Sequence, residues 1–414
     1  MRKFSLPEII VFAVAALLPT YLLRFHIGPF PTTVLEVVIL VAIGTLAIQK
    51  FVIARSESRR ATRQSRENIT MAALFIRLLR RLWPPRNDDA LLTIGSVLIL
   101  IATIVGIIVA PDKRSALGIA KAFFWEPMAL AWLIIAAKPD KEKIWRAMLG
   151  GFAVSALVVV VYGLLQYTHP ALIPTTWRAE RRITSVFDYP NAAALFLAPL
   201  VALLLSSPAT IALAFFAVIV IILAKSAGGL IAVAAALFFL GVTNKKMRVT
   251  TMVVAATITI IVLFAPPAAG LREQILLQDW SGRVHVIGWK ESLAMLRDHP
   301  IFGAGLDGFK TAVAPYHHAQ GVEIFQYPHN LFLAIWSELG LLGLLGFVCV
   351  FVWLFVASAR KRTPHPTLSP SGARGKYIIA VFIAILIHGL VDVPYFKNDL
   401  AMMFWLFIIL VALY

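Results

Sequence analysis

The residues of this chain with types and spacing suited to chemistry gather between Trp280 and Gly343. Three cations in this stretch, Arg283, Lys290 and Arg297, are seven residues apart, so they share one face if the segment is helical. The apolar residues of the same segment recur at helical spacing at Val286, Trp289, Leu293 and Leu296. We therefore expect a helix that lies along a membrane surface and directs its cations at an anionic ligand.

A second group of cations lies in the sequence T-T-W-R-A-E-R-R-I-T-S-V-F-D-Y-P-N, which contains Arg178, Arg181, Arg182 and Asn191. Guanidinium groups bind phosphate and carboxylate oxygens through charge-assisted hydrogen bonds. A phosphate-bearing or acidic ligand would explain three arginines in a short connection between apolar segments. Pairing of these arginines with neighbouring carboxylates and lipid headgroups is the structural alternative.

Arginines and a histidine together suit transfer from a diphosphate leaving group. Arg182 and Arg283 could neutralise the departing phosphates, and His329 could accept the proton of an acceptor hydroxyl near neutral pH. His329 and Asn330 come directly before a long apolar segment. A purely structural histidine at the beginning of that helix is the alternative interpretation.

The composition identifies a membrane protein. Hydrophobic residues make up 60% of the 414 residues and charged residues 14%, and the mean hydropathy is +0.84. Apolar stretches of about 20 residues recur along the chain, as expected for transmembrane helices. We predict an all-α polytopic fold with about twelve spans, at residues 7–23, 32–49, 90–110, 119–137, 147–166, 190–206, 209–224, 228–243, 249–265, 330–357, 377–391 and 399–414.

The distribution of Lys and Arg predicts the orientation. With a cytoplasmic N-terminus, 24 of the 38 basic residues fall in inside segments and 14 outside, five of them in the long loop 266–329. Basic residues concentrate in cytoplasmic loops, and long loops count little in this rule. We therefore expect both termini in the cytoplasm and the Trp280 stretch outside. The rule also accounts for the net charge of +17 without a nucleic-acid partner.

The expected organisation is a single membrane domain, 1–414, with three notable connections. Residues 50–89 form a basic cytoplasmic loop with a surface helix at 71–82, and 266–329 form the large extracytoplasmic loop. Residues 358–376 are rich in Pro, Ser and Gly and form a cytoplasmic linker. The single cysteine, Cys349, allows no intramolecular disulfide.

Other polar residues beside the apolar segments are candidates for a site. Arg24 lies in a first outer connection that contains no carboxylate, and Lys225 lies between the seventh and eighth predicted spans. The sequence I-H-G-L-V-D-V-P-Y-F-K-N-D-L carries His388, Asp392 and Lys397 near the end of the chain. Ionisable groups near a membrane interior are often functional. His388 and Asp392 could equally form a structural pair.

Several motifs together resemble the O-antigen ligase and O-antigen polymerase superfamily. They are R-I-T-S-V-F-D-Y-P-N, S-G-R with a following Trp, D-H-P-I-F-G-A-G-L-D-G-F, and H-N-L-F-L-A-I-W-S-E-L-G-L-L-G. The resemblance extends over the whole chain, because it includes the twelve spans and the long loop between spans nine and ten. One difference is Ser226-Ala227-Gly228, where the family often has S-R-G; Lys225 could substitute for that arginine.

The resemblance implies a GT-C-like glycosyltransferase of the bacterial cytoplasmic membrane. Its donor would be a glycan linked to undecaprenyl diphosphate, its acceptor a lipid, a glycan or a protein, and it would need no metal or other cofactor. By motif, His329, Arg283 and Arg182 are the catalytic candidates. The candidates for substrate binding are Arg24, Arg178, Arg181, Asn191, Asn330 and Lys225.

Two alternatives remain at this point. A polysaccharide or lipid transporter would also have twelve spans, but paired broken helices in two similar halves would mark it. The halves of this chain do not match, and the polar residues gather near one expected face. Among transferases, a ligase, a repeat-unit polymerase and a protein O-oligosaccharyltransferase share the motifs that we find.

Overall fold

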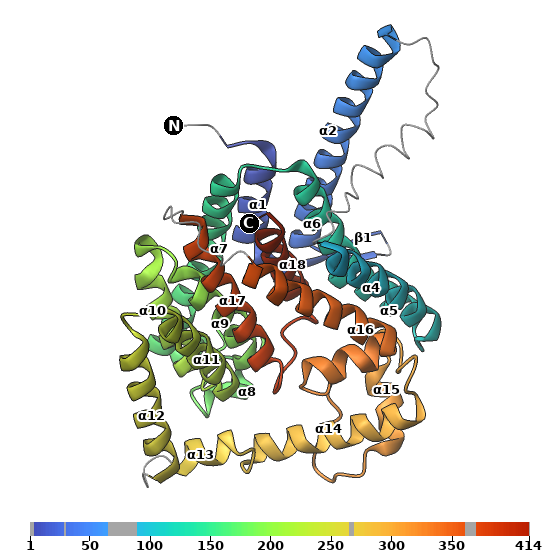
Figure 1. Ribbon diagram of the computed structural model, residues 1–414. Helices are drawn as coiled ribbons and strands as arrows, with labels where there is room; N and C mark the ends of the chain where they lie inside the picture. The colour runs from blue at the N-terminus through green and yellow to red at the C-terminus, as the bar shows by residue number, and fades with distance from the viewer. Residues whose placement is uncertain (1–3, 29, 65–88, 265–268, 361–369, 414) are drawn as a thin grey trace.

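The structure is a computed structural model that describes residues 4–28, 30–64, 89–264, 269–360 and 370–413. In this part of the chain the fold is a bundle of helices with one two-stranded antiparallel hairpin, β1 (Arg24–Ile27) and β2 (Phe30–Thr33) (Figure 1). The expectation of an all-α membrane protein is therefore confirmed in its coarse form.

The helices follow one another with short connections. The first half contains α1 (Leu6–Ala16), the short η1 (Leu18–Leu22), α2 (Val34–Gln64), α4 (Ala90–Val109), α5 (Lys113–Ile119), a π-helical turn (Ala120–Trp125), α6 (Glu126–Ala137), α7 (Lys141–Thr168), α8 (Thr175–Arg178) and α9 (Pro190–Leu204). The second half contains α10 (Ile211–Leu223), α11 (Ala227–Thr243), α12 (Arg248–Phe264), α13 (Ala269–Ile275), α14 (Trp280–Asp298), α15 (Phe309–Val313), α16 (Leu331–Arg360), α17 (Pro370–His388) and α18 (Asn398–Leu413).

Each of the twelve apolar segments overlaps a helix of the structure. Among the described residues, five helices are long and apolar enough to cross a membrane, at Val34–Val52, Ala90–Val109, Lys113–Ala137, Lys141–Thr168 and Leu331–Ser358. Five further apolar helices are shorter, between 10 and 17 residues. The number of twelve spans stays a prediction, because several of these helices are too short to cross a bilayer unaided.

Two predicted boundaries differ from the structure. The segment 7–23 is divided at Leu17 into α1 and η1, because Pro19 cannot continue the hydrogen-bond pattern of an α-helix. Residues 50–64 continue α2 instead of beginning a loop. The surface helix expected at 71–82 lies outside the described residues, as do residues 361–369 of the expected linker.

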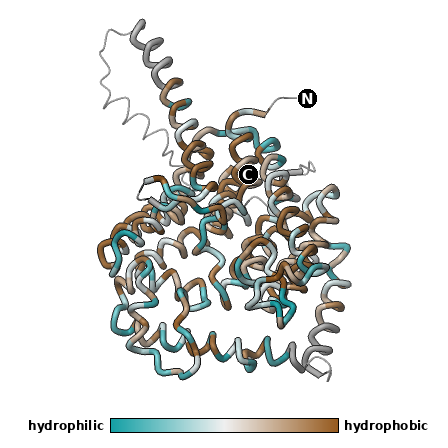
Figure 2. The backbone as a smooth tube through the Cα atoms, turned by 180° about the vertical axis from the view of Figure 1, so that it is seen from behind, coloured by the Kyte–Doolittle hydropathy of each residue, from teal (hydrophilic) through white to brown (hydrophobic). Residues whose placement is uncertain are grey.

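The core of the bundle surrounds two central helices. Every residue of α18 from Asp399 to Val411 is buried, and α9 is buried along almost its whole length. A helix that is apolar on all sides is stable only when other helices enclose it. By contrast, large apolar side chains on the outer helices are exposed, among them Phe215 at 63% and Ile108 at 67%. Figure 2 shows that hydrophobic residues occur along most helices of the bundle.

Helices α13 and α14 lie across one end of the bundle (Figure 1). The first helix, α1, and the C-terminal end of α18 lie toward the opposite end. The long connection between α12 and α16 therefore places its helices at the end of the molecule where α16 begins. This arrangement brings α14 beside the beginning of α16 and the turn between α17 and α18.

Candidate functional site

The helix predicted around the three cations is α14. Asp279 caps its N-terminus by accepting a hydrogen bond from the backbone N–H of Gly282 at 2.9 Å. All three cations are exposed. Leu293, which the apolar spacing assigned to the packed face, is 44% exposed, whereas Met295 and Leu296 are buried against α15. The helix was predicted correctly, but its buried face is set by α15 and not by the apolar spacing alone.

The glycine-rich string Asp298–Phe309 packs into a break in α16. Gly340 interrupts this helix with φ of 66°, and a Cβ atom there would lie 2.2 Å from the carbonyl oxygen of Ile301. Gly303 has φ of 64°, and a Cβ atom at this position would lie 2.3 Å from the carbonyl oxygen of Ser337. Only glycine allows both the positive φ and the close backbone approach. The glycines of the two motifs therefore form one structural junction.

Glu338 closes the same junction from inside the protein. Its side chain is fully buried and accepts hydrogen bonds from the backbone N–H groups of Asp307 and Phe309. A buried carboxylate is stabilised only when such donors satisfy it. Glu338 and Gly340, the E-x-G part of the motif in α16, thus hold the loop before α15 against α16. Because α15 packs against α14, this also positions α16 relative to α14.

His329 is positioned by its neighbours on both sides. It adopts φ of 49°, and its backbone carbonyl accepts a hydrogen bond from the indole of Trp289 at 3.3 Å. Asn330 caps α16, because its side-chain oxygen accepts the N–H groups two and three residues later, at 3.0 and 3.1 Å. Its amide also donates to the carbonyl of Leu390 at 3.0 Å. The side chain of Asn330 therefore joins the beginning of α16 to the α17–α18 turn, and its role in substrate binding stays a prediction.

That turn presents Asp392 to His329. The carboxylate oxygen Oδ1 of Asp392 lies 3.4 Å from Nδ1 of His329 and also accepts the backbone N–H of Val393. Burial alone would raise the pKa of Asp392, but the contact with His329 and the charges of His329 and His388 lower it to about 2. The second oxygen, Oδ2, is buried without a hydrogen-bond partner in the described part of the chain. The result is a charged carboxylate between two imidazoles.

His388 approaches the same carboxylate from the end of α17. It is 2% exposed, and its Nδ1 has no hydrogen-bond partner among the described residues. A Cβ atom added to Gly228 would lie 3.1 Å from the imidazole and 2.8 Å from Val391. Gly228, the glycine that this chain shares with the S-R-G pattern, therefore lets the beginning of α11 pack against His388.

His285 is a residue of this cluster that the sequence analysis missed. Its ring centroid lies 5.0 Å from that of His329 and 6.4 Å from that of Trp289. Burial, and then the charge of His329, lower the pKa of His285 to about 4, so it is neutral near pH 7. A signal was present, because His285 lies one helical turn before Trp289 and two residues after Arg283. That spacing alone did not distinguish it from a packing residue.

A cavity of about 200 Å³ lies beside the histidines. Arg182, Asn191 and Lys225, all predicted as site residues, line it. His285, His388 and Asp392 also line it, together with parts of α11 and the segment before α14. The structure thus brings residues from five separate stretches of the chain to one polar cavity.

Arg182 is held in this cavity from several sides. Its Nε donates to the carbonyl of Ala224 at 3.1 Å and one terminal nitrogen donates to Asn191 at 3.2 Å. The guanidinium also lies 5.1 Å from the ring centroid of Trp177 and 3.8 Å from a carboxylate oxygen of Glu180. Burial lowers the pKa of Arg182, and Glu180 opposes this effect. Asn191 therefore contributes to the cavity mainly by orienting Arg182.

The neighbouring cations differ in their surroundings. Lys225 is exposed at φ of 51°, and its Nζ donates to the carbonyl of Glu180 at 2.7 Å while its side chain lines the cavity. Arg178 donates to the carbonyl of Ile173 at 2.9 Å and so closes the preceding turn. Arg181 is exposed and does not line this cavity. The structure therefore brings two of the four cations to the cavity, and a role for Arg178 and Arg181 in substrate binding stays a prediction.

Two further predicted residues lie apart from the cavity. Arg283 is exposed in the first turn of α14, with its guanidinium 5.9 Å from the ring centroid of Trp280. Arg24 lies on β1 and lines a different cavity. The structure does not bring either guanidinium to the walls that Arg182 lines, and their assigned roles stay predictions.

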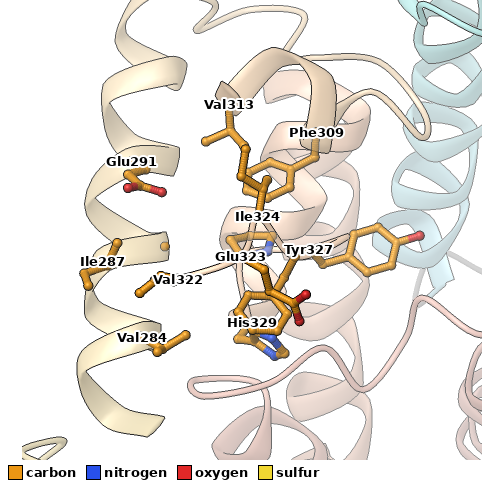
Figure 3. Close-up of a pocket in the computed structure, with 13 residues that line it drawn as sticks. Val284, Ile287, Glu291, Phe309, Val313, Val322, Glu323, Ile324, Tyr327 and His329 are labelled. Atoms are coloured by element: carbon orange, nitrogen blue, oxygen red, sulfur yellow. The ribbon is translucent and has the colours of Figure 1, made fainter. Parts of the chain in front are cut away.

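A small cavity of about 20 Å³ adjoins the other side of His329. Val284, Ile287 and Glu291 of α14 point toward it, and the loop that ends at His329 forms its other wall (Figure 3). A space of this size holds about one water molecule. His329 therefore lines the small cavity beside α14. Its neighbours His285 and Asp392 line the larger polar cavity.

Comparison with known families finds one that resembles part of the chain. Residues 212–348 match the family model described as O-antigen ligase, and this range includes Lys225, Arg283 and His329. No curated protein matches the chain significantly. The family indicates a glycosyltransferase-like enzyme of the ligase or polymerase type, which acts in lipopolysaccharide biosynthesis. The chain is therefore a multi-pass membrane protein in which residues 212–348 are similar to the O-antigen ligase family.

Proposed function

We propose that this protein transfers a glycan from undecaprenyl diphosphate to an acceptor hydroxyl at the outer face of the bacterial cytoplasmic membrane, without a metal ion. The observation that supports this most strongly is the contact of 3.4 Å between His329 and the buried Asp392. This pair lies next to a cavity lined by Arg182 and Lys225. A base held by a carboxylate beside two cations suits transfer from an anionic leaving group.

His329 acts as the general base. Its Nδ1–H donates to Asp392, which leaves Nε2 to accept a proton from the acceptor hydroxyl. The carboxylate then stabilises the imidazolium that forms, as in other carboxylate-oriented histidine bases. Asp392 is suited to this role because it stays ionised while buried. His388 lines the same cavity as Asp392.

The reaction balances without a further reactant. The acceptor oxygen forms a bond to the anomeric carbon of the glycan while the bond between that carbon and the diphosphate oxygen breaks. The acceptor proton goes to His329, and the lipid diphosphate leaves with the bonding electrons. Deprotonation of His329 by water then restores the enzyme.

Cations and neutral donors hold the diphosphate. Arg182 and Lys225 supply positive charge at one wall of the cavity, and the neutral imidazole of His285 adds a hydrogen-bonding group to another wall. Arg283, in the first turn of α14, contributes a further positive charge. Because it does not line this cavity, substrate binding would have to bring its guanidinium and the diphosphate together. In this proposal the arginines take the charge-neutralising role that a divalent cation has in other transferases.

The proposed orientation follows the distribution of basic residues. Both termini lie in the cytoplasm, and α14 lies at the outer face within the extracytoplasmic loop 266–329. The basic segment 50–89 and the linker 358–376 are then cytoplasmic. The membrane domain is one unit, 1–414, in a GT-C-like arrangement.

A lipid, a glycan or a protein could supply the acceptor hydroxyl, and we favour a ligase-like reaction with a lipid-borne acceptor because the matched family is that of O-antigen ligase. The test is to reconstitute the protein in proteoliposomes with a defined undecaprenyl-diphosphate glycan and a membrane extract, and to identify the glycosylated product. We expect a new glycosidic bond and release of undecaprenyl diphosphate. Movement of the intact donor between leaflets, without such a bond, would instead favour a transporter.

A further inference from the structure

A second and larger cavity lies on the other side of the turn that carries Asp392. It has a volume of about 820 Å³ and is enclosed by η1, the β1–β2 hairpin, the first turn of α2, α5 with the π-helical turn, and the segment from Phe396 to Asn398. Phe396 also contacts Tyr327, at 5.0 Å between ring centroids, two residues before His329. The cavity is therefore separate from the polar cavity but adjoins the same catalytic segment.

The cavity carries more positive than negative charge. Four cations line it, Arg24, Arg114, Lys121 and Lys397, together with the carboxylates Glu36 and Asp112. Both carboxylates are already engaged. Glu36 accepts hydrogen bonds from Thr32 at 2.7 Å and lies 3.6 Å from Lys121. Asp112 caps α5 by accepting two backbone N–H groups.

Lys397 contacts aromatic rings and no carboxylate. Its ammonium lies 5.0 Å from the ring centroids of Tyr21 and Phe187 and 5.1 Å from that of Tyr189. Within the described residues, no hydrogen bond or ion pair of this ammonium is found. Burial lowers the pKa of Lys397, and the charges of Asp399, Asp188 and Asp392 oppose this effect. Cation–π contacts orient such a group but leave its hydrogen-bond donors available.

Arg24 lies on β1 beside the same cavity, and its side chain is exposed. The rim around it is apolar. Phe25 and Leu117 line the cavity and are 40% and 46% exposed, and Ile27 of the same strand is 59% exposed. Exposed apolar residues beside a cationic cavity are typical of a surface that meets lipid acyl chains and headgroups together. The mouth of the cavity therefore suits a ligand that arrives from the bilayer.

We propose that this cavity binds the phosphate-bearing headgroup of an anionic membrane lipid other than the glycan donor. Arg24 and Lys397 contact the phosphate, and the apolar rim contacts the beginning of the acyl chains. A bound lipid would also stabilise the turn between Asp392 and Asn398, because Lys397 lies in that turn.

Native mass spectrometry of the full-length protein in detergent tests this site without requiring transfer. The probes are phosphatidylglycerol, phosphatidylcholine, undecaprenyl diphosphate and inorganic phosphate. We expect Arg24→Gln and Lys397→Gln each to weaken phosphatidylglycerol binding at least tenfold, because each removes a charge-assisted contact. Lys310→Gln, which removes an exposed cation on α15, is the matched control and should leave binding unchanged.

Undecaprenyl diphosphate should bind Lys397→Gln within about twofold of the unmodified protein, because Arg182 lines a different cavity. Unchanged phosphatidylglycerol affinity in Arg24→Gln and Lys397→Gln would overturn the proposal. Parallel loss of undecaprenyl diphosphate would also overturn it, because the cavity would then belong to the donor site. Displacement of the lipid by an equal concentration of inorganic phosphate, or equal binding of phosphatidylcholine, would remove the claim of anionic-lipid recognition. If Lys397→Gln does not fold, Arg24→Glu, an exposed charge reversal, carries the same test.

Discussion

Replacement of Asp392 by asparagine tests the pairing on which the proposed base depends. Asparagine keeps the size of the side chain and an oxygen that can accept from His329, but it removes the charge. We therefore expect Asp392→Asn to fold and to bind donor, while the chemical step slows. The pKa of Asp392 is lowered from 3.8 to about 2, so the carboxylate is ionised throughout the range of any transfer assay.

The size of the effect follows from that pKa. A shift of this size corresponds to roughly 2 kcal/mol in net favour of the ionised carboxylate, at 1.36 kcal/mol per pH unit. The interaction is reciprocal, so the carboxylate stabilises an imidazolium beside it by a similar amount, shared between His329 and His388. We expect single-turnover transfer to fall roughly 10- to 100-fold, since each 1.36 kcal/mol is a factor of ten in rate. The stability contributed by this carboxylate is present above pH 3.8 and is lost only as the pH falls through about 2.

The assay is single-turnover transfer in proteoliposomes between pH 5 and 9, with donor binding measured in parallel. Asp298→Asn is the control, since Asp298 is an exposed carboxylate on α14 that accepts a hydrogen bond from Tyr316. Transfer within threefold of wild type across this pH range would refute the pairing. Joint loss of donor binding and thermal stability would show that Asp392 is structural.

Three further predictions address the phosphate contacts, the absence of a metal and the motif junction. Arg182→Lys and Arg283→Lys should each lower the transfer rate by one to two decades, roughly 1.5 to 3 kcal/mol, if each guanidinium binds the diphosphate through two hydrogen bonds. Near-normal turnover in Arg283→Lys alone would show that Arg182, and not Arg283, binds the diphosphate in this way. Transfer should survive EDTA, and loss that Mn²⁺ or Mg²⁺ restores would contradict a metal-independent reaction. Gly303→Ala should lower the free energy of unfolding by at least about 3 kcal/mol. Gly321 has a similar φ but open space around it, so Gly321→Ala should lower the free energy of unfolding by only about 1 to 2 kcal/mol. Equal decreases in melting temperature for the two variants would refute the steric argument.

Much of the fold could be predicted because apolar length and helical spacing are local properties. The apolar segments coincide with helices, and the helix beginning at Trp280 was expected from its spacing. The position of His329 directly before a long helix was also read correctly, because α16 begins at Leu331. Helix ends were less predictable, since Pro19 and the glycine at 340 alter the backbone in ways that apolar content does not report.

The partnership of His329 with Asp392 could not be predicted, because 63 residues separate them and no local pattern links them. Asp392 was considered a member of a pair with His388, and the structure places it between the two histidines. His285 was missed because a single histidine on an amphipathic helix looks like a packing residue. These relationships depend on how α14, α16 and the α17–α18 turn pack together, which residue spacing does not determine.

The structure also separates residues that sequence analysis had grouped as candidates for substrate binding. Arg178 forms hydrogen bonds to backbone carbonyls, and Asn330 caps a helix, although both are polar residues near the expected site. Arg24 lines the larger cavity instead of the one that contains Arg182. Residue type and predicted topology identify which side chains are available, but tertiary packing decides which of them meet.

Single-turnover transfer by His329→Ala tests the central claim most directly. The variant and the wild-type protein should be compared in proteoliposomes for membrane yield, thermal stability, binding of the undecaprenyl-diphosphate glycan and rate of transfer. Loss of a general base typically costs about 10² to 10⁴ in rate. We predict a loss in this range with yield, stability and donor binding close to wild type. Transfer within about threefold of wild type would contradict the assignment of His329 as the base.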